Sequence, residues 1–144
     1  MPSVAKSGDR RRHEMIIEDE ITAAQLIAAY EAGQRRFVSI EVIDKEAVPV
    51  FNTCLSGAEF IDCVLFSPTF ENVDFRHTRF VGCNLKCATF RGCDLSGSLW
   101  NNCAVESLSI SACETLDLEA TELHAYGGEI DGTSRFLDYA QKNV

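Results

Sequence analysis

The sequence has few of the residues that catalysis, nucleic-acid binding and membrane insertion depend on. Only three of its 144 residues are histidine, and 22 Asp and Glu outnumber 13 Lys and Arg, which gives a net charge of −9 at pH 7. Phosphate contacts need Lys and Arg, so this balance argues against direct binding of nucleic acid. No apolar run is long enough to cross a bilayer, and residues 1–13 have no hydrophobic segment behind their arginines. We therefore expect a cytoplasmic protein with no membrane span and no secretory signal.

A large apolar residue recurs at every fifth position for more than fifty residues, with a small or compact residue two positions before each. In an extended chain, positions i and i−2 point to the same side, so each pentad supplies two inward side chains. Coils stacked about 4.8 Å apart would pair their backbones around a continuous core, so this fixed short period predicts a solenoid. The large positions are Leu55, Phe60, Leu65, Phe70, Phe75, Phe80, Leu85, Phe90, Leu95, Trp100, Val105 and Ile110.

The register is ambiguous over residues 113–132. The position of the large residue in each pentad is the large slot, and the position two residues before it is the small slot. Leu118 and Leu123 occupy the small slot, while Ala120 and Ala125 occupy the large slot. Either the two slots exchange volumes or the frame shifts, and the sequence leaves both alternatives open.

Five of the seven cysteines stand in the small slot, at Cys63, Cys83, Cys93, Cys103 and Cys113. A buried free cysteine behaves as a small hydrophobic residue, which suits this position. Neighbouring cysteines in a stacked column would have parallel side-chain vectors, which strain a disulfide. We therefore expect free thiols.

Several pentads share a small residue, a polar residue and Leu or Phe in sequence. They are Ala58-Glu59-Phe60, Val73-Asp74-Phe75, Cys83-Asn84-Leu85, Ala88-Thr89-Phe90 and Cys93-Asp94-Leu95. This register, with the segment 30–37 before it, resembles the pentapeptide-repeat family over residues 20–132. The resemblance implies an all-β solenoid, a right-handed quadrilateral β-helix with four pentads in each coil.

The chain divides into four expected segments. Residues 1–14 are expected to form a disordered tail, and 35–132 the β-helix. An apolar stripe with helical spacing predicts an N-terminal capping helix over 15–34, and 133–144 should form a C-terminal helix. Helices at both ends would cover the unpaired edges of the stack.

The apolar residues of the C-terminal helix have two interpretations. In quinolone-resistance members of the family, a C-terminal helical segment mediates dimerisation. Phe136, Leu137 and Tyr139 therefore either cap the stack or form a homodimer contact, and both interpretations remain open.

The sequence predicts no catalytic residues, no metal site and no cofactor. His77, Cys83 and Cys87 are the nearest approach to a metal-ligand set, but the pentad frame turns Cys83 inward and the other two outward. Gly82, Gly92 and Gly97 occupy outward corner positions, which is typical of turn residues and not of a phosphate-binding loop.

Charged residues one coil apart should form columns on the outer surface. Asp74, Asp94 and Glu114 are spaced by twenty residues, so they should form a ladder of carboxylates about 4.8 Å apart. Glu71 with Arg91, and Glu106 with Lys86, should form exposed ion pairs by the same spacing.

Two functional hypotheses follow. The preferred one is a non-catalytic scaffold for protein–protein interaction with an unknown partner, which would contact an apolar patch of Phe66 and Leu99 with Ile61 and Val64. The alternative comes from the resemblance to quinolone-resistance proteins, which implies an acidic DNA mimic that binds a type II topoisomerase such as gyrase. The carboxylate ladder would then be the binding surface.

Overall fold

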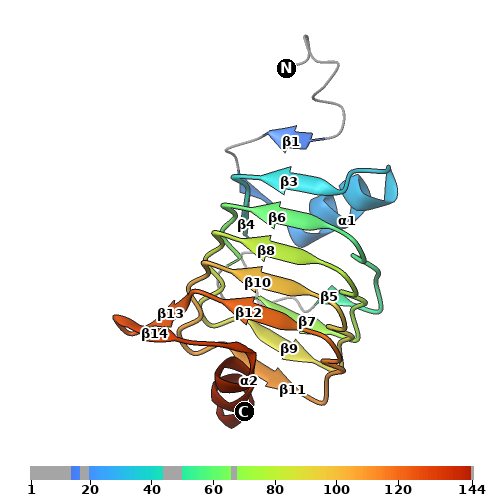
Figure 1. The fold of residues 1–144 in the computed structure, drawn as a ribbon. Helices are drawn as coiled ribbons and strands as arrows, with labels where there is room; N and C mark the ends of the chain where they lie inside the picture. The colour runs from blue at the N-terminus through green and yellow to red at the C-terminus, as the bar shows by residue number, and fades with distance from the viewer. Residues whose placement is uncertain (1–13, 17–19, 44–49, 66–67, 144) are drawn as a thin grey trace.

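The chain winds into a β-solenoid with four walls and a helix at each end (Figure 1). The structure, a computed structural model, describes residues 14–16, 20–43, 50–65 and 68–143. The largest sheet, wall A, has the parallel strand order β1-β3-β6-β8-β10-β12. Its strands are β1 Glu14–Ile16, β3 Arg36–Val38, β6 Glu59–Ile61, β8 Arg79–Val81, β10 Leu99–Asn101 and β12 Glu119–Thr121.

Three further walls complete each coil. Wall C contains the parallel strands β5 Val50–Phe51, β7 Thr69–Glu71, β9 Thr89–Arg91 and β11 Ser109–Ser111. Wall B begins with β2 Glu20–Ile21 and β4 Glu41–Val42, continues through single bridges at Val64, Asn84 and Ala104, and ends at β13 Leu123–Ala125. Wall D is a ladder of single bridges that joins Cys54, Asp74, Asp94 and Glu114.

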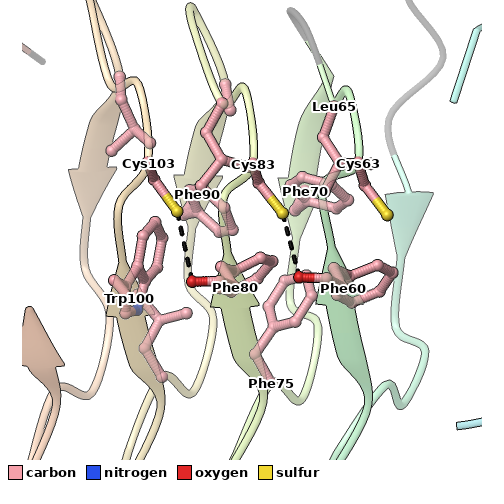
Figure 2. Packing of buried hydrophobic residues seen from close by; sticks show 14 of the residues in the cluster. Phe60, Cys63, Leu65, Phe70, Phe75, Phe80, Cys83, Phe90, Trp100 and Cys103 are labelled. Atoms are coloured by element: carbon pink, nitrogen blue, oxygen red, sulfur yellow. Dashed lines mark hydrogen bonds between the residues drawn. The ribbon is translucent and has the colours of Figure 1, made fainter. Parts of the chain in front are cut away.

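The interior is formed by the two slots of each pentad, as the period predicts. Paired residues on wall A are twenty apart from β6 onward, so Phe60, Phe80 and Trp100 stack on one another. Their ring centroids are 5.5 and 4.7 Å apart, and all three side chains are at most 1 % exposed. Figure 2 shows these rings beside the thiols of Cys63, Cys83 and Cys103, which form a parallel column.

The ambiguous register of residues 113–132 is resolved in favour of exchanged volumes. Leu118 and Ala120 are both buried, and Ala120 pairs with Trp100 in the unbroken frame. Leu123 is also buried in the small slot. A large residue in the small slot therefore offsets an alanine in the large slot.

The N-terminal helix is shorter than the expected segment 15–34. Helix α1 spans Ala23–Glu31, and the chain before it forms β1 and β2. Thr22 follows strand β2 and caps the helix: its side chain accepts a hydrogen bond from Gln25 N, and the Gln25 side chain accepts one from Thr22 N. This capping box fixes the helix start, so the apolar stripe before it belongs in part to strand β2. In the first coil the paired residues are 23 apart instead of 20, so the register slips between β4 and β5.

The C-terminal end of the stack is closed differently. β13 turns back through Tyr126 and Gly127 into the antiparallel strand β14 Gly128–Ile130, and helix α2 Thr133–Lys142 follows. Helix α2 packs against β11 and β12 beneath the last coil (Figure 1). Neither helix in the described part of the chain has the length and apolar character needed to traverse a membrane.

Candidate functional site

Wall D carries the three carboxylates that the sequence analysis singled out. Asp74 bridges to Asp94, and Asp94 bridges to Glu114, so the three residues stand on successive rungs of one wall. Asp74, Asp94 and Glu114 together form the carboxylate column.

One arginine offsets much of the charge in the upper part of this column. Arg76 Nε and Nη2 donate to Asp74 Oδ1 and Oδ2 at 3.0 and 2.8 Å, and Nε lies 3.9 Å from Asp94 Oδ2. The hydrogen bond from the Arg76 side chain, with a second from its backbone N–H, holds the pKa of Asp74 below its usual value. Two of the three carboxylates therefore share a cation.

The aspartates of the column also have a structural role. Asp74 Oδ1 accepts a hydrogen bond from Arg76 N, and Asp94 Oδ1 accepts one from Ser96 N, both at 3.0 Å. Asn84, at the same pentad position on wall B, accepts from Lys86 N at 3.1 Å. A short polar side chain that binds the backbone two residues later stabilises a turn. The Asp or Asn of the repeat therefore helps the chain to turn each corner.

The two ion pairs expected from coil spacing have different outcomes. Arg91 Nη1 lies 3.0 Å from Glu71 Oε2, which confirms the first pair. Glu106 Oε2 instead accepts a hydrogen bond from Tyr126 N at 3.0 Å. This bond, assisted by the nearby charge of Lys86, lowers the pKa of Glu106.

The residues proposed as an apolar patch lie on different walls. Leu99 is half-buried on wall A, in register with Arg79 and Glu119, and Ile61 lies on the same wall. Val64 belongs to wall B, and Phe66 lies outside the described residues. The structure therefore does not bring Val64 and Leu99 together.

A different apolar column, not anticipated from the sequence, runs along wall A. Val38, Ile61 and Val81 pair in register and are all half-buried. Ile61 and Val81 each follow a large residue and are twenty apart, so coil spacing could have related these two. Val38 pairs with Ile61 at 23 residues and could not be added from that spacing. Beside it Glu59 lies 3.5 Å from Arg36 and 3.9 Å from Arg79, so the flanking charges are paired.

The apolar residues of α2 pack onto the last coil. Phe136 is fully buried, with its ring centroid 5.1 Å from that of Trp100. The Tyr139 hydroxyl donates to Val105 O at 3.0 Å and accepts from Ser107 N at 2.9 Å. Leu137 is only half-buried. Phe136 and Tyr139 therefore contribute to a cap within the chain.

The thiols of the small slot are free and largely enclosed. Cys63, Cys83, Cys93 and Cys103 are buried, and Cys113 is half-buried. Cys83 Sγ donates to Phe60 O and Cys103 Sγ to Phe80 O, at 3.1 and 3.3 Å (Figure 2). Hydrogen bonding to Cys103 and Cys63, together with burial, raises the pKa of Cys83. Hydrogen bonds from Cys93 lower the pKa of Cys113 to about 7.

The nearest approach to a metal-ligand set in the sequence is split between the inside and the outside of the coil. Cys83 is buried while His77 and Cys87 are exposed, so this set does not converge. Within the described ranges, no group of three or more His, Cys, Asp or Glu side chains is placed to hold a metal ion.

These features define a class of protein: a β-solenoid of five-residue units whose core is filled by side chains and whose charged residues lie on its outer walls. The sequence profile of the pentapeptide repeat region matches residues 51–127, more than half of the chain. The chain therefore belongs to the pentapeptide-repeat family, whose members are generally non-enzymatic. No curated protein matches the chain by sequence.

Proposed function

We propose that this protein is a non-catalytic scaffold in the cytoplasm that binds a protein partner through its outer walls. The observation that carries the proposal is the half-buried apolar column of Val38, Ile61 and Val81 on wall A. Paired backbones fix these side chains in a regular row. A rigid row of apolar groups beside charges is suited to a protein contact. The free cysteines support a reducing compartment.

The test is crosslinking and affinity capture from native cytosol with wild type, Ile61→Ser and Val81→Ser. Both substitutions change outward side chains of wall A, so we expect loss of the partner with retention of the folded structure by circular dichroism. Ser111→Ala, an outward change on wall C, is the matched control. Identical partners for all four proteins would contradict a role for wall A.

A second candidate function, mimicry of DNA toward a type II topoisomerase such as gyrase, is supported by the carboxylate column. Its rungs repeat at about 4.8 Å, and a column of negative charge can attract a protein surface that normally binds phosphates. The test is a gyrase supercoiling assay over a salt series.

The variants make this test specific to the column. Asp74→Asn with Asp94→Asn and Glu114→Gln should weaken the effect on gyrase. Arg76→Ala should strengthen it, because it removes the cation from the column. No effect of wild type at low salt, or equal effects of all variants, would reject the mimicry.

A homodimer through α2 remains a separate proposal. Phe136 is fully buried, whereas Leu137 and Tyr139 are both half-buried. Substitution of Leu137 tests a contact with a second copy without breaking the Tyr139 hydrogen bonds to the last coil. Sedimentation of wild type and Leu137→Ser tests it, and a concentration-independent monomer for wild type would reject it.

A further inference from the structure

Each rung of wall D is bonded to the next through the same three backbone groups. Leu55 N and Gly57 N donate to Asp74 O and Arg76 O at 2.8 and 2.9 Å, and Thr53 O accepts from Asp74 N at 3.0 Å. The pattern repeats in the following coils, where Leu95 N and Gly97 N donate to Glu114 O and Leu116 O. A rung of wall D therefore presents two donors and one acceptor to its successor.

The last rung of wall D, Cys113–Asp117, has no successor. By the repeat, the backbone groups of this rung that would bond to a successor are Thr115 N, Asp117 N and Cys113 O. None of them has a hydrogen-bond partner among the described residues. Leu116 on this rung is 72 % exposed, and Cys113 is less enclosed than the other thiols of the small slot. We call this rung the open edge.

On each of the other walls, α2, its end or β14 bonds at least one backbone group of the last coil. On wall A, Thr133 Oγ1 accepts from Ala120 N at 3.0 Å. Wall B ends at β13, which pairs with β14, and the Tyr139 hydroxyl binds Val105 O and Ser107 N of the rung before it. On wall C, Asn143 Nδ2 donates to Leu108 O at 2.8 Å. Within the described chain, no such contact reaches the open edge. Unpaired strand edges of this kind are templates for another extended segment.

The charge of the open edge distinguishes a second copy of this chain from an extended segment of another protein. Glu114 and Asp117 are exposed on the open edge, and Asp94 lies one rung above. A second copy that joined edge to edge would bring these carboxylates together, which is unfavourable. An extended segment with a basic side chain is attracted instead.

We propose that the open edge binds an extended, basic segment of a protein partner, which adds to wall D as its next rung. The segment accepts hydrogen bonds from Thr115 N and Asp117 N and donates one to Cys113 O. In the register of the wall, a basic side chain lies over Glu114, an apolar one faces inward over Thr115, and the next outward side chain lies over Leu116. The proposal names a partner class for the scaffold and in that sense rests on the proposed function, although it uses a different wall.

The experiment titrates the full chain with a capped peptide of alternating lysine and valine and follows amide hydrogen exchange by NMR. We expect exchange at Thr115 and Asp117 to slow at least tenfold, and alkylation of Cys113 to slow with it. A glutamate–valine peptide of equal length should give neither effect. Glu114→Gln with Asp117→Asn should weaken binding of the lysine peptide about tenfold.

Glu20→Gln with Glu31→Gln is the control, since it changes the net charge equally at the other end of the stack and should leave binding unchanged. Equal protection by both peptides, protection at other walls, or no protection would overturn the proposal. Protection that depends on protein concentration without peptide would assign the edge to a second copy and would also overturn it. Because Ile61 and Val81 lie on wall A, failure here leaves the test of the scaffold intact.

Discussion

At the scale of single residues, each corner of the coil is formed by a residue with positive φ, two positions after the large slot. Asp62, Asn72 and Asn102 have φ values of 55–56°, and Gly82 and Gly97 have 67 and 70°. Gly, Asn and Asp tolerate this left-handed region better than other residues. This preference explains why short polar residues and glycine recur at the corners.

Gly97 lies directly below His77 in one corner column. A Cβ at Gly97 would stand 2.6 Å from His77 Nδ1, whereas a Cβ at Gly57 in the same column meets nothing within 4 Å. Gly57→Ala should cost about 1 kcal/mol from backbone conformation alone. Gly97→Ala should cost more, because the imidazole ring must also move. Urea unfolding of both variants measures the loss of unfolding free energy. Equal losses would show that the close approach of His77 to Gly97 adds nothing to the cost of the substitution.

The bond between Arg76 and Asp74 predicts a dependence of stability on pH. The pKa of Asp74 is lower in the folded protein than the value of about 3.9 expected for an unfolded chain. The bond therefore stabilises the fold above that pH, and this contribution is lost as the pH falls through the folded pKa.

Arg76→Ala should raise the pKa of Asp74 and reduce the loss of stability below pH 4. Carboxyl NMR titration and unfolding across pH measure both effects. Arg79→Ala, which removes a cation beside Glu59, is the control and should leave Asp74 unchanged. An Asp74 pKa that is the same in wild type and Arg76→Ala would contradict the assignment of the shift.

The bond between Arg76 and Asp74 could not be predicted from coil spacing. Residues twenty apart stack in one column, which is why Glu71 and Arg91 could be paired from the sequence. Arg76 reaches back two positions across its own corner, and the repeat period does not describe that contact. The ladder expected from coil spacing therefore has a cation beside it, Arg76, whose bond the spacing does not predict.

At the scale of elements, the strands of the repeat followed from the sequence more closely than the ends did. From β5 onward the two inward residues of each pentad keep the same spacing, so the position of each strand can be read from its own pentad. The start of α1 instead depends on the capping box of Thr22 and Gln25, and β1 forms only by pairing with β3. Helical spacing of the apolar residues before Thr22 could not reveal that partner.

The β13–β14 hairpin ends the coil through a two-residue turn. Tyr126 and Gly127 both have positive φ, at 52 and 79°, which suits the tight turn between antiparallel strands. In the pentad frame Gly127 is also a regular corner residue. The sequence therefore did not distinguish another corner from a reversal of the chain.

The Tyr139 hydroxyl attaches α2 to wall B through two backbone groups. Tyr139→Phe would leave Val105 O and Ser107 N without these bonds, which should cost about 1 kcal/mol or more. The exposed Tyr126, whose hydroxyl is bonded to Ser107 Oγ, is the matched position. Tyr126→Phe should cost less. Thermal unfolding compares the two, and an equal or larger loss for Tyr126→Phe would contradict the capping role.

At the scale of the whole molecule, one row of aromatic rings connects the first coil to the C-terminal helix. Phe37, Phe60, Phe80, Trp100 and Phe136 follow one another with centroid separations of 4.7–5.5 Å. Each coil therefore packs mainly on its neighbours, and the stability of the stack depends on the interfaces between coils.

Phe136→Ala should destabilise the protein by about 3–5 kcal/mol, because it removes a fully buried ring from the end of this row. Hydrogen exchange should accelerate more in β12 and β10 than in β3 and β6, since the lost contact lies at one end of the stack. Leu137→Ala, at the half-buried neighbouring position, is the control and should have a smaller effect. Uniform acceleration along wall A would show that the stack opens only as a single unit.

The corner residues also bear on how such a protein can change its length. A single inserted or deleted residue before a corner would turn every later inward side chain toward solvent until the frame was restored. Gain or loss of twenty residues leaves every column intact and only makes the tube taller or shorter. Duplication of whole coils is thus the route by which evolution can lengthen this molecule without redesigning its interior.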